Sequence, residues 1–525
     1  MALGAQAGEN RIVLPGAALA AGVAGTHWRS DLQLFNPGAS AVKATVRFLR
    51  FSSTESAEES YTVEAGHLLV LEDVVSSLGT DGAGTLEITA DGPILAGMRT
   101  YNRTSGGSFG QFVTPNATTI QAQAQSYGAG FLPGVIDNGA YRSNVGVFNP
   151  EGSRVSWSID GAPMSLEPHS GWQRRVTEIA SIDGEGDTLI LGGTPVLSYL
   201  SVIDNHSGDP TYIPPQDAAV AGTLVGVAHQ AGANGTQWRS DLFLHATEAT
   251  TVLLELRPWG KSSGPSTSIE LGAGETRVVH DVVGTLMGVE GGGMLTYSAT
   301  HPISVSARTY TEGSKGSCGQ GILPAAVMEE GYFLFLRDDE DFRSNLALYN
   351  PTGNQVGYRL EAFSADGSSL GTDTVSVPAG SAVQLNRVIH RFGLQELTAG
   401  YLEVSGGLFG GYLSFVDNAS GDGSTVLPQG LAPEARVTGA SVFGRIRSLY
   451  SEASEATITV IDASDWSVAA RPAPDHSGRF HADLPGPGGY WIVAGTPDEM
   501  SGARWLQVGE APVEARIVLA PMPGM

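Results

Sequence analysis

One five-residue motif occurs four times in this chain and constrains its fold more than any other feature. Each copy has an aromatic residue, Arg, Ser, an acidic residue or its amide, and an aliphatic residue, in that order. Such recurrence predicts four structural units, each large enough to bury a core of its own. The copies occupy 28–32, 141–145, 238–242 and 342–346; an aromatic residue with Asn-Pro follows at 35–37, 148–150 and 349–351, and the third copy has 245–247, His-Ala-Thr, instead.

Two kinds of ending alternate along the four units. Units of the first kind, A, end in Arg-Thr-Tyr and then Gly-Ser-x-Gly-Gln, whereas units of the second kind, B, end in Asp-Asn-x-Ser-Gly-Asp. The order A-B-A-B, with like units about 200 positions apart, indicates that a two-domain block was duplicated whole. We therefore expect A and B to pack as a pair, 218–222 to be a short connector, and the array to be rod-like. The A endings lie at 99–111 and 308–320, and the B endings at 204–209 and 417–422.

The composition favours short strands over long helices. The chain of 525 residues has 70 Gly and 28 Pro, and only 16% of its residues are charged. In the first motif strand Ser30, Leu32 and Leu34 alternate with Arg29 and Gln33, the period of a half-buried strand. We expect the first set to point into a core and Gln33 to face solvent. The predicted fold is all-β: a tandem array of immunoglobulin-like β-sandwiches, A1 at 11–125, B1 at 126–221, A2 at 222–330 and B2 at 331–435.

These units resemble uncharacterised tandem repeats of secreted bacterial proteins, through the motif strand and the two kinds of ending. The last segment, 436–525, resembles a carboxypeptidase regulatory-like, transthyretin-like β-sandwich. That resemblance rests on 437–439, 444–446 and 456–460, on Ser-Gly-Arg-Phe at 477–480, and on the turn at 484–493, where an additional glycine-proline pair lengthens the usual form. Both resemblances imply export and a cell-surface or extracellular role in adhesion, structure or binding, without known catalytic residues.

The charge limits the classes of partner. Acidic residues number 54 against 29 basic ones, a formal charge of −25, and Lys stands only at 43, 261 and 315. Such a surface repels nucleic acid and anionic lipid, so we do not expect a nucleic-acid partner. The sequence has no run of about 18 apolar residues, so we do not expect membrane insertion either. A cell-envelope or extracellular protein or glycan is the expected partner, with self-association also possible. Residues 1–10 form a tail in which Ala-Gln-Ala at 5–7 has the form of a signal-peptidase site without the regions that should precede it, so truncation and chance both stay open.

The signals for catalysis are weak. Residues 106–110 fit the G-x-S-x-G nucleophile pattern, but strand-like sequence lies on both sides, where that motif needs a helix after it. The eleven His do not cluster, and Cys318 aligns with Phe109 of the first unit, which favours a small buried apolar residue. We expect a protein that is not an enzyme. A hydrolase whose triad is dispersed along the chain is the less favoured alternative.

The B endings are the best candidates for a metal site. Their oxygen donors lie close together in one loop, as a hard cation such as Ca²⁺ requires. Asx turns explain the same letters through local hydrogen bonds to the backbone, and this second interpretation is favoured. The candidate ligands are Asp204, Asn205, Asp209, Asp417, Asn418 and Asp422.

Two further sets of residues could bind glycans. The motif arginines could receive an anionic glycan if all four were exposed on one side, although a local pairing role at the end of a sheet is favoured. Several Trp could be stacking platforms for sugars, which would make the protein a glycan-binding accessory region, although most Trp in sandwiches belong to cores. The arginines are Arg29, Arg142, Arg239 and Arg343, and the tryptophans are Trp157, Trp172, Trp259, Trp466, Trp491 and Trp505.

Overall fold

The computed structural model divides the chain into two compact units, Met1–Leu431 and Ala432–Met525, which are described separately. The tail at 1–9, the segment 437–439, the turn at 477–478 and the glycine-proline turn at 485–487 lie outside the described residues. The residues described are 10–51, 53, 55–113, 115, 129–182, 185–193, 196–314, 316–430, 441–448, 456–464, 466–474, 479–484, 488–496, 500–508 and 513–521.

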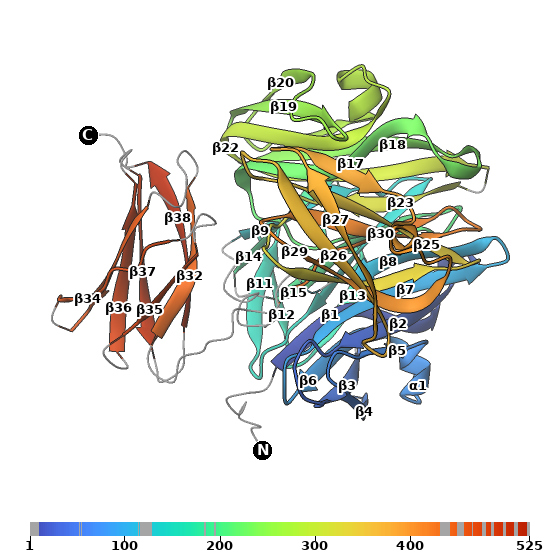
Figure 1. The fold of residues 1–525 in the computed structure, drawn as a ribbon, viewed down its shortest axis with the longest axis horizontal. Helices are drawn as coiled ribbons and strands as arrows, with labels where there is room; N and C mark the ends of the chain where they lie inside the picture. The colour runs from blue at the N-terminus through green and yellow to red at the C-terminus, as the bar shows by residue number, and fades with distance from the viewer. Residues whose placement is uncertain are drawn as a thin grey trace. The chain divides into compact units, whose positions relative to one another are not determined.

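A1 is a sandwich whose first strand belongs to both of its sheets (Figure 1). The order of strands is β4-β3-β6-β1-β2-β7-β8, and β5 pairs with β2. The register of β1 against β6 shifts between Pro15 and Ala17, and β1 then pairs with β2 at its end. The elements are β1 (Asn10–Ala21), η1 (Val23–Gly25), β2 (His27–Phe35), β3 (Val42–Arg50), β4 (Ser56–Val63), β5 (Leu68–Leu71), α1 (Val74–Ser77), β6 (Gly82–Ala90), β7 (Leu95–Thr104) and β8 (Gly107–Val113).

A2 repeats this plan, and its first strand corrects one expectation. Residues 219–222, predicted to be part of a connector, begin the long strand β17, which pairs with β22 from Ala219 onward. The backbone of B1 therefore passes almost directly into the core of A2. The elements are β17 (Ala219–Ala231), η3 (Ala233–Gly235), β18 (Gln237–Ala246), β19 (Thr250–Pro258), β20 (Ser266–Leu271), β21 (Thr276–Val279), η4 (Val282–Leu286), β22 (Gly291–Gly313) and β23 (Gly316–Ile322).

B1 and B2 are sandwiches of two separate four-stranded sheets. In B1 the orders are β12-β11-β14-β9 and β13-β10-β15-β16, and B2 has the equivalent orders β24-β29-β26-β27 and β28-β25-β30-β31. In B1 the elements are β9 (Ala129–Val135), β10 (Tyr141–Phe148), β11 (Val155–Ile159), β12 (Ala162–Leu166), β13 (Gly171–Arg175), η2 (Val176–Glu178), β14 (Asp187–Gly193), β15 (Leu197–Asp204) and β16 (Pro210–Ile213). In B2 they are β24 (Gly331–Asp338), β25 (Phe342–Tyr349), β26 (Val356–Ser364), β27 (Ser369–Val377), β28 (Ala382–Leu385), η5 (Val388–Phe392), β29 (Leu397–Ser405), β30 (Gly410–Asp417) and β31 (Gly423–Val426).

The motif strands have the predicted orientation. Leu32 and Leu34, with their counterparts in the other three units, are fully buried in the four cores. The motif Ser is also fully buried and joins neighbouring strands: the Ser30 hydroxyl accepts the Ala18 N–H at 2.9 Å, and the Ser143 hydroxyl donates to the Ile136 carbonyl at 2.7 Å. A hydroxyl at this position therefore satisfies backbone groups that the strand pairing leaves open.

Gln33 contradicts the expectation that it faces solvent. Its side chain is 5% exposed, and its Oε1 accepts the N–H of Phe335 at 2.7 Å. Phe335 belongs to B2, so the outer face of β2 is covered by a different sandwich. The corresponding residue of A2, Phe243, is buried in the same way against the core of B1.

The four sandwiches close on one another, so the expected rod-like array is wrong. Strand β8 of A1 contacts β16 of B1 and β31 of B2, and β23 of A2 contacts the same two strands. Each A sandwich therefore packs against both B sandwiches, and the chain brings A1 back to B2. The same type of contact recurs within each A-B pair: a Cβ at Gly226 would lie 2.4 Å from the Tyr412 hydroxyl, and one at Gly16 would lie 3.1 Å from the Tyr199 hydroxyl.

The second unit is a further β structure, which agrees with the all-β prediction. Its strands follow the order β34-β33-β36-β37-β38-β32-β35. Phe480 is buried, as expected for the first inward residue of its strand, and Tyr490, Ile492 and Ala494 of β36 point into the same core. The elements are β32 (Ser441–Ser448), β33 (Thr457–Asp462), β34 (Val468–Ala470), β35 (Arg479–Asp483), β36 (Gly488–Gly495), β37 (Met500–Val508) and β38 (Val513–Pro521).

Candidate functional site

The predicted metal-binding loop of B1, which connects β15 to β16, docks on the β22–β23 hairpin of A2. The Ser317 N–H and hydroxyl donate to Asp204 Oδ2 at 2.9 and 2.8 Å, and the N–H groups of His206 and Ser207 donate to Asp204 Oδ1. Five residues further on, Asp209 Oδ2 accepts the Gly319 N–H at 3.0 Å. The B ending therefore recognises the A ending through exposed backbone N–H groups.

The loop of B2 docks on the β7–β8 hairpin of A1 with the same geometry. The Ser108 N–H and hydroxyl each donate to Asp417 Oδ2 at 2.8 Å, and the Gly110 N–H donates to Asp422 Oδ2 at 2.9 Å. The Ser420 hydroxyl donates in return to the Ser108 carbonyl at 2.8 Å. Two sequence endings thus form one repeated interface, between partners far apart in the chain.

A bound cation would need carboxylate oxygens that are free to coordinate it, and these contacts place N–H and O–H donors on those oxygens instead. Both oxygens of Asp204, and both of Asp417, accept N–H or O–H groups, and Asn205 and Asn418 accept from Arg142 and Arg343. Within the described ranges no three His, Cys, Asp or Glu side chains form a group that could hold a metal. The local bonds are those of an Asx turn, the other interpretation of the sequence. Calcium binding stays a prediction from sequence, and this donor set does not support it.

Hydrogen bonds to Asp204, the first aspartate of the B1 loop, determine the direction in which its pKa is shifted. Burial alone would raise the pKa of Asp204, but the Ser317 and Ser207 N–H groups and the Ser317 hydroxyl lower it below its ordinary value. The pKa of Asp417 is lowered for the same reasons. Both carboxylates are therefore ionised near neutral pH, and the N–H and O–H groups that they accept stabilise their charge.

The second loop acids, Asp209 and Asp422, meet where the two docked loops come together. Both are fully buried; Arg308 lies 3.2 Å from Asp209, and Arg99 lies 3.6 Å from Asp422. Burial and then the charge of Asp422 raise the pKa of Asp209 well above its ordinary value, and burial raises the pKa of Asp422 to about 6. Among the described residues neither Oδ1 has an N–H or O–H donor of its own, and the two carboxyl groups interact with each other. A proton shared by the two carboxyl groups is the arrangement that satisfies both.

The G-x-S-x-G pattern has a structural role. Ser108 is 1% exposed, and its hydroxyl donates to Asp417 and accepts from Arg99 at 3.1 Å. Such a hydroxyl is not accessible to a substrate. Cys318, the neighbour of the equivalent Ser317, is buried as expected, and burial raises the pKa of its thiol.

The motif arginines pair locally, as the favoured interpretation expected. Arg142 and Arg343 donate to Asn205 and Asn418 of the docking loops at 2.6 and 2.7 Å. Arg29 donates to Asp73 at 2.8 Å, and Arg239 lies 3.9 Å from Glu312. One of the four, Arg343, also lines a groove between sandwiches.

That groove lies between A2 and B2 and has a volume of about 410 Å³. Trp238 and Trp259 line it from A2, while Tyr412, Arg343 and Arg387 line it from B2. Ligand pockets typically have about 300–1,000 Å³ and combine aromatic walls with a few convergent polar groups. This groove is our candidate binding site.

The other candidate tryptophans divide between core and surface. Trp157 is buried in the core of B1, and Trp172 packs against that core. In the second unit Trp466 and Trp505 are 68% and 48% exposed, and Trp491 pairs with Trp505 across β36 and β37, which places both on one face of the sheet. Exposed tryptophans therefore occur in the C-terminal sandwich, whereas Trp259 belongs to the groove.

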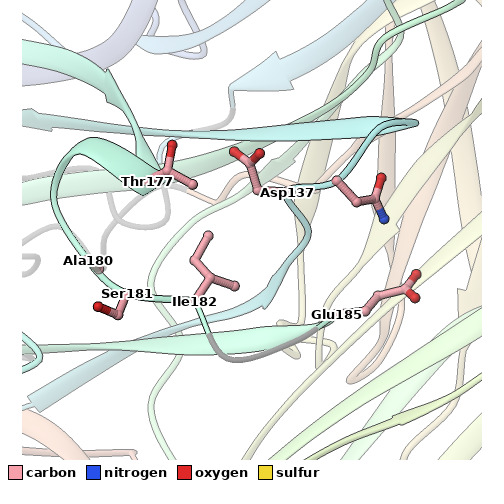
Figure 2. Close-up of a pocket in the computed structure, with 7 residues that line it drawn as sticks. Asp137, Thr177, Ala180, Ser181, Ile182 and Glu185 are labelled. Carbon is pink, nitrogen blue, oxygen red and sulfur yellow. The ribbon is translucent and has the colours of Figure 1, made fainter.

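A second hollow, of about 630 Å³, lies at the edge of B1 (Figure 2). Figure 2 shows Asp137 and Thr177 on one side of it, with Ile182 and Glu185 on the loop opposite. The Asp137 carboxylate is already paired with Arg175. This hollow is open and carries no aromatic side chain among its lining residues, so it is the weaker site.

Comparison with known proteins adds little. No family model matches the chain, and no curated protein matches it. Among solved structures, the chain is similar to a tetra-tandem repeat in the extending region of a large adhesion protein, at 13% identity, over 76% of this chain and 93% of that chain, with a TM-score of 0.10. At that TM-score the likeness supports no conclusion about fold or function. No helix among the described residues has the length and apolar character to cross a bilayer.

Proposed function

We propose that this protein is a non-catalytic, extracellular binding protein, in which four interlocked sandwiches form a stable scaffold for recognition of a cell-envelope or extracellular ligand. The observation that supports this proposal most is the use of the recurrent motif side chains. The hydrogen bonds that hold the sandwiches together are made by Ser108, Ser317 and the four loop aspartates. The recurrent residues thus have a structural role, and we assign ligand binding to the groove between A2 and B2.

Export is part of the same proposal. Its support is the resemblance of the repeats to those of secreted proteins and an acidic surface, which keeps an exposed protein soluble. The scaffold also suits a structural or adhesion role, because each sandwich is supported by two neighbours. Self-association through the exposed face of the C-terminal sandwich belongs to this wider proposal.

A hydrolase is the second candidate, because two His-Asp pairs are present. His229 lies 2.8 Å from Asp281, and His280 lies 3.1 Å from Asp241. The nearest motif hydroxyl, that of Ser240, is fully buried and bonded to Ala228 and Thr309. This serine is therefore unsuitable as a nucleophile, and the binding role is better supported.

Retention of the full chain on extracellular polysaccharides and on cell-envelope preparations tests the proposal. We expect the protein to be retained by at least one of these matrices and to leave the chain length of the polysaccharide unchanged in size-exclusion chromatography. Loss of polymer length, or labelling of the native protein by a fluorophosphonate, would favour the hydrolase. Absence of retention on every matrix would overturn the binding proposal.

A further inference from the structure

The groove between A2 and B2 has an unusual charge for this protein. The chain carries 54 acidic residues, yet the residues that line the groove include Arg343 and Arg387 and no Asp or Glu. Field lines from basic groups are concentrated in a hollow with low-dielectric walls, so an anion is attracted there even when the net charge is negative.

The two arginines are held close together. Arg343 donates to the neutral amide of Asn418, while Arg387 pairs with the buried carboxylate of Asp338. Burial, and after it the charge of Arg387, lowers the pKa of Arg343. The guanidinium of Arg343 thus has a neutral hydrogen-bond partner and the like charge of Arg387 nearby, and the carboxylates of Asp338 and Asp417 offset that repulsion in part. A carboxylate entering the groove would relieve this repulsion and could accept two parallel N–H bonds.

The remaining walls suit the rest of a sugar. Trp238 and Trp259 are both partly exposed, and an indole face can cover the apolar face of a pyranose ring. Gln230, Gln384 and Asn386 add amide donors and acceptors, which match hydroxyl groups. Gln384 and Asn386 are joined at 2.9 Å, so these two amides form a connected polar wall.

We propose that the groove between A2 and B2 binds an acidic oligosaccharide, with a sugar carboxylate on Arg343 and a sugar ring against Trp259. This inference rests on the proposed binding function and specifies the ligand class and its location. The amide-rich wall fits a polyhydroxylated ligand better than an apolar one.

The sister junction between A1 and B1 offers matched substitutions. The first strands of the two A units, β1 and β17, place Ala20 at the position of Gln230, because these residues pair with Trp28 and Trp238. Phe51 likewise occupies the position of Trp259, one residue after the end of the equivalent strand pairings. Trp259→Phe and Gln230→Ala therefore introduce side chains that the same scaffold already accommodates.

The experiment is a titration of the full chain, by calorimetry and tryptophan fluorescence, with oligogalacturonate, oligomannuronate and a hyaluronan fragment. Their carboxyl-reduced, neutral forms are the ligand controls. We expect at least one acidic oligosaccharide to bind about tenfold more tightly than its neutral form, with an advantage that falls as salt rises. The variants Gln384→Glu and Trp259→Phe should each weaken binding about tenfold, because one adds a repulsive charge and the other a smaller ring.

Gln355→Glu is the control variant, since it adds the same charge at an exposed position away from the groove. Asn386→Glu, at the exposed rim, gives a second groove variant if Gln384→Glu lowers the melting temperature. Equal affinity for acidic and neutral forms would overturn the acidic class. Binding that Gln384→Glu, Asn386→Glu and Trp259→Phe all leave unchanged would overturn the groove while preserving the binding function. Failure of every saccharide, with retention on a protein matrix, would overturn this inference alone.

Discussion

The interface between B1 and A2 and the interface between B2 and A1 use the same backbone contacts but support the central arginine differently. Arg308 donates to Thr211, Tyr141, Asp209 and Ser317, so its guanidinium is bonded on each nitrogen. Arg99 donates to Ser108, has a buried Nε without a partner, and lies over the rings of Phe342 and Phe415. Both guanidinium groups lie over aromatic rings, those of Tyr141 and Tyr310 in the case of Arg308, but only Arg308 is hydrogen-bonded on every nitrogen. The loop-to-hairpin contact therefore tolerates two different hydrogen-bond surroundings.

The largest expected effect comes from removing these arginines. Arg308→Met should lower the free energy of unfolding by about 3 to 5 kcal/mol, because it breaks a buried ion pair and leaves several hydrogen-bond partners open. Arg99→Met should cost only about 1 to 3 kcal/mol, because Arg99 makes one side-chain hydrogen bond, to Ser108, and lies farther from its carboxylate, at 3.6 Å from Asp422. Urea titration of the full chain, followed by tryptophan fluorescence, measures both. A greater loss for Arg99→Met would reverse the comparison.

The buried carboxyl groups of Asp209 and Asp422, where the two interfaces meet, should make the free energy of unfolding depend on pH. The folded pKa of Asp422 is about 6, above its ordinary value, and that of Asp209 is also raised. A raised carboxyl pKa means that the folded state binds more protons, so this contribution is complete below about pH 4 and is lost as pH rises through 6. The loss should reach up to about 3 kcal/mol between pH 4 and 7, since a pKa unit corresponds to about 1.4 kcal/mol.

Two variants with the same chemical change separate this effect from other titrations. Asp209→Asn imitates the protonated acid, so it should flatten the pH dependence and be more stable than the wild type at pH 7. Asp204→Asn should instead destabilise at pH 7, because its amide N–H would face the N–H donors of Ser317 or Ser207. An Asp209→Asn protein with the wild-type slope would refute the shared proton.

The outer faces of the motif strands provide the next comparison. Gln33→Ala should cost about 1 to 3 kcal/mol, because the buried N–H of Phe335 loses its acceptor. Gln33→Leu keeps a side chain of similar volume and should restore little of this loss, since the N–H of Phe335 stays unsatisfied. Thermal or urea denaturation measures both variants. A cost below about 0.5 kcal/mol for Gln33→Ala, as is usual at exposed sites, would mean that B2 does not cover this face.

Gln33 also shows what sequence could and could not predict. Alternation along one strand identifies the residues that face its own core, and the burial of Leu32 and Leu34 followed from it directly. The alternation carries no information about a second sandwich on the other face of the strand, because the residue that covers Gln33 is about 300 positions away in the chain.

The docking contacts were hidden for a related reason. Their donors are mostly backbone N–H groups at Ser108, Gly110, Ser317 and Gly319, which leave little trace in the side chains. The available signal was the alternation itself: each acid-rich ending has one counterpart that offers glycine and serine. Asp204 and Asp417 each accept four hydrogen bonds, and the Asx turn accounts for the two local ones. The donor of the other two lies 113 positions away in one copy and 309 in the other.

The smallest expected effect is the response to calcium. A cation bound only by the folded state at a hundred times its dissociation constant would add about 2.7 kcal/mol, so removing it with a chelator would lower the melting temperature by several degrees. We expect no shift with chelator or with added Ca²⁺, because the oxygens of Asp204 and Asp417 accept N–H and O–H groups that a cation would have to displace. Differential scanning calorimetry of the wild type and of Asp204→Asn provides the measurement. A rise with Ca²⁺ in the wild type that the variant lacks would show that the loop opens to bind the cation, and it would change both interfaces from fixed contacts into ligand-dependent ones.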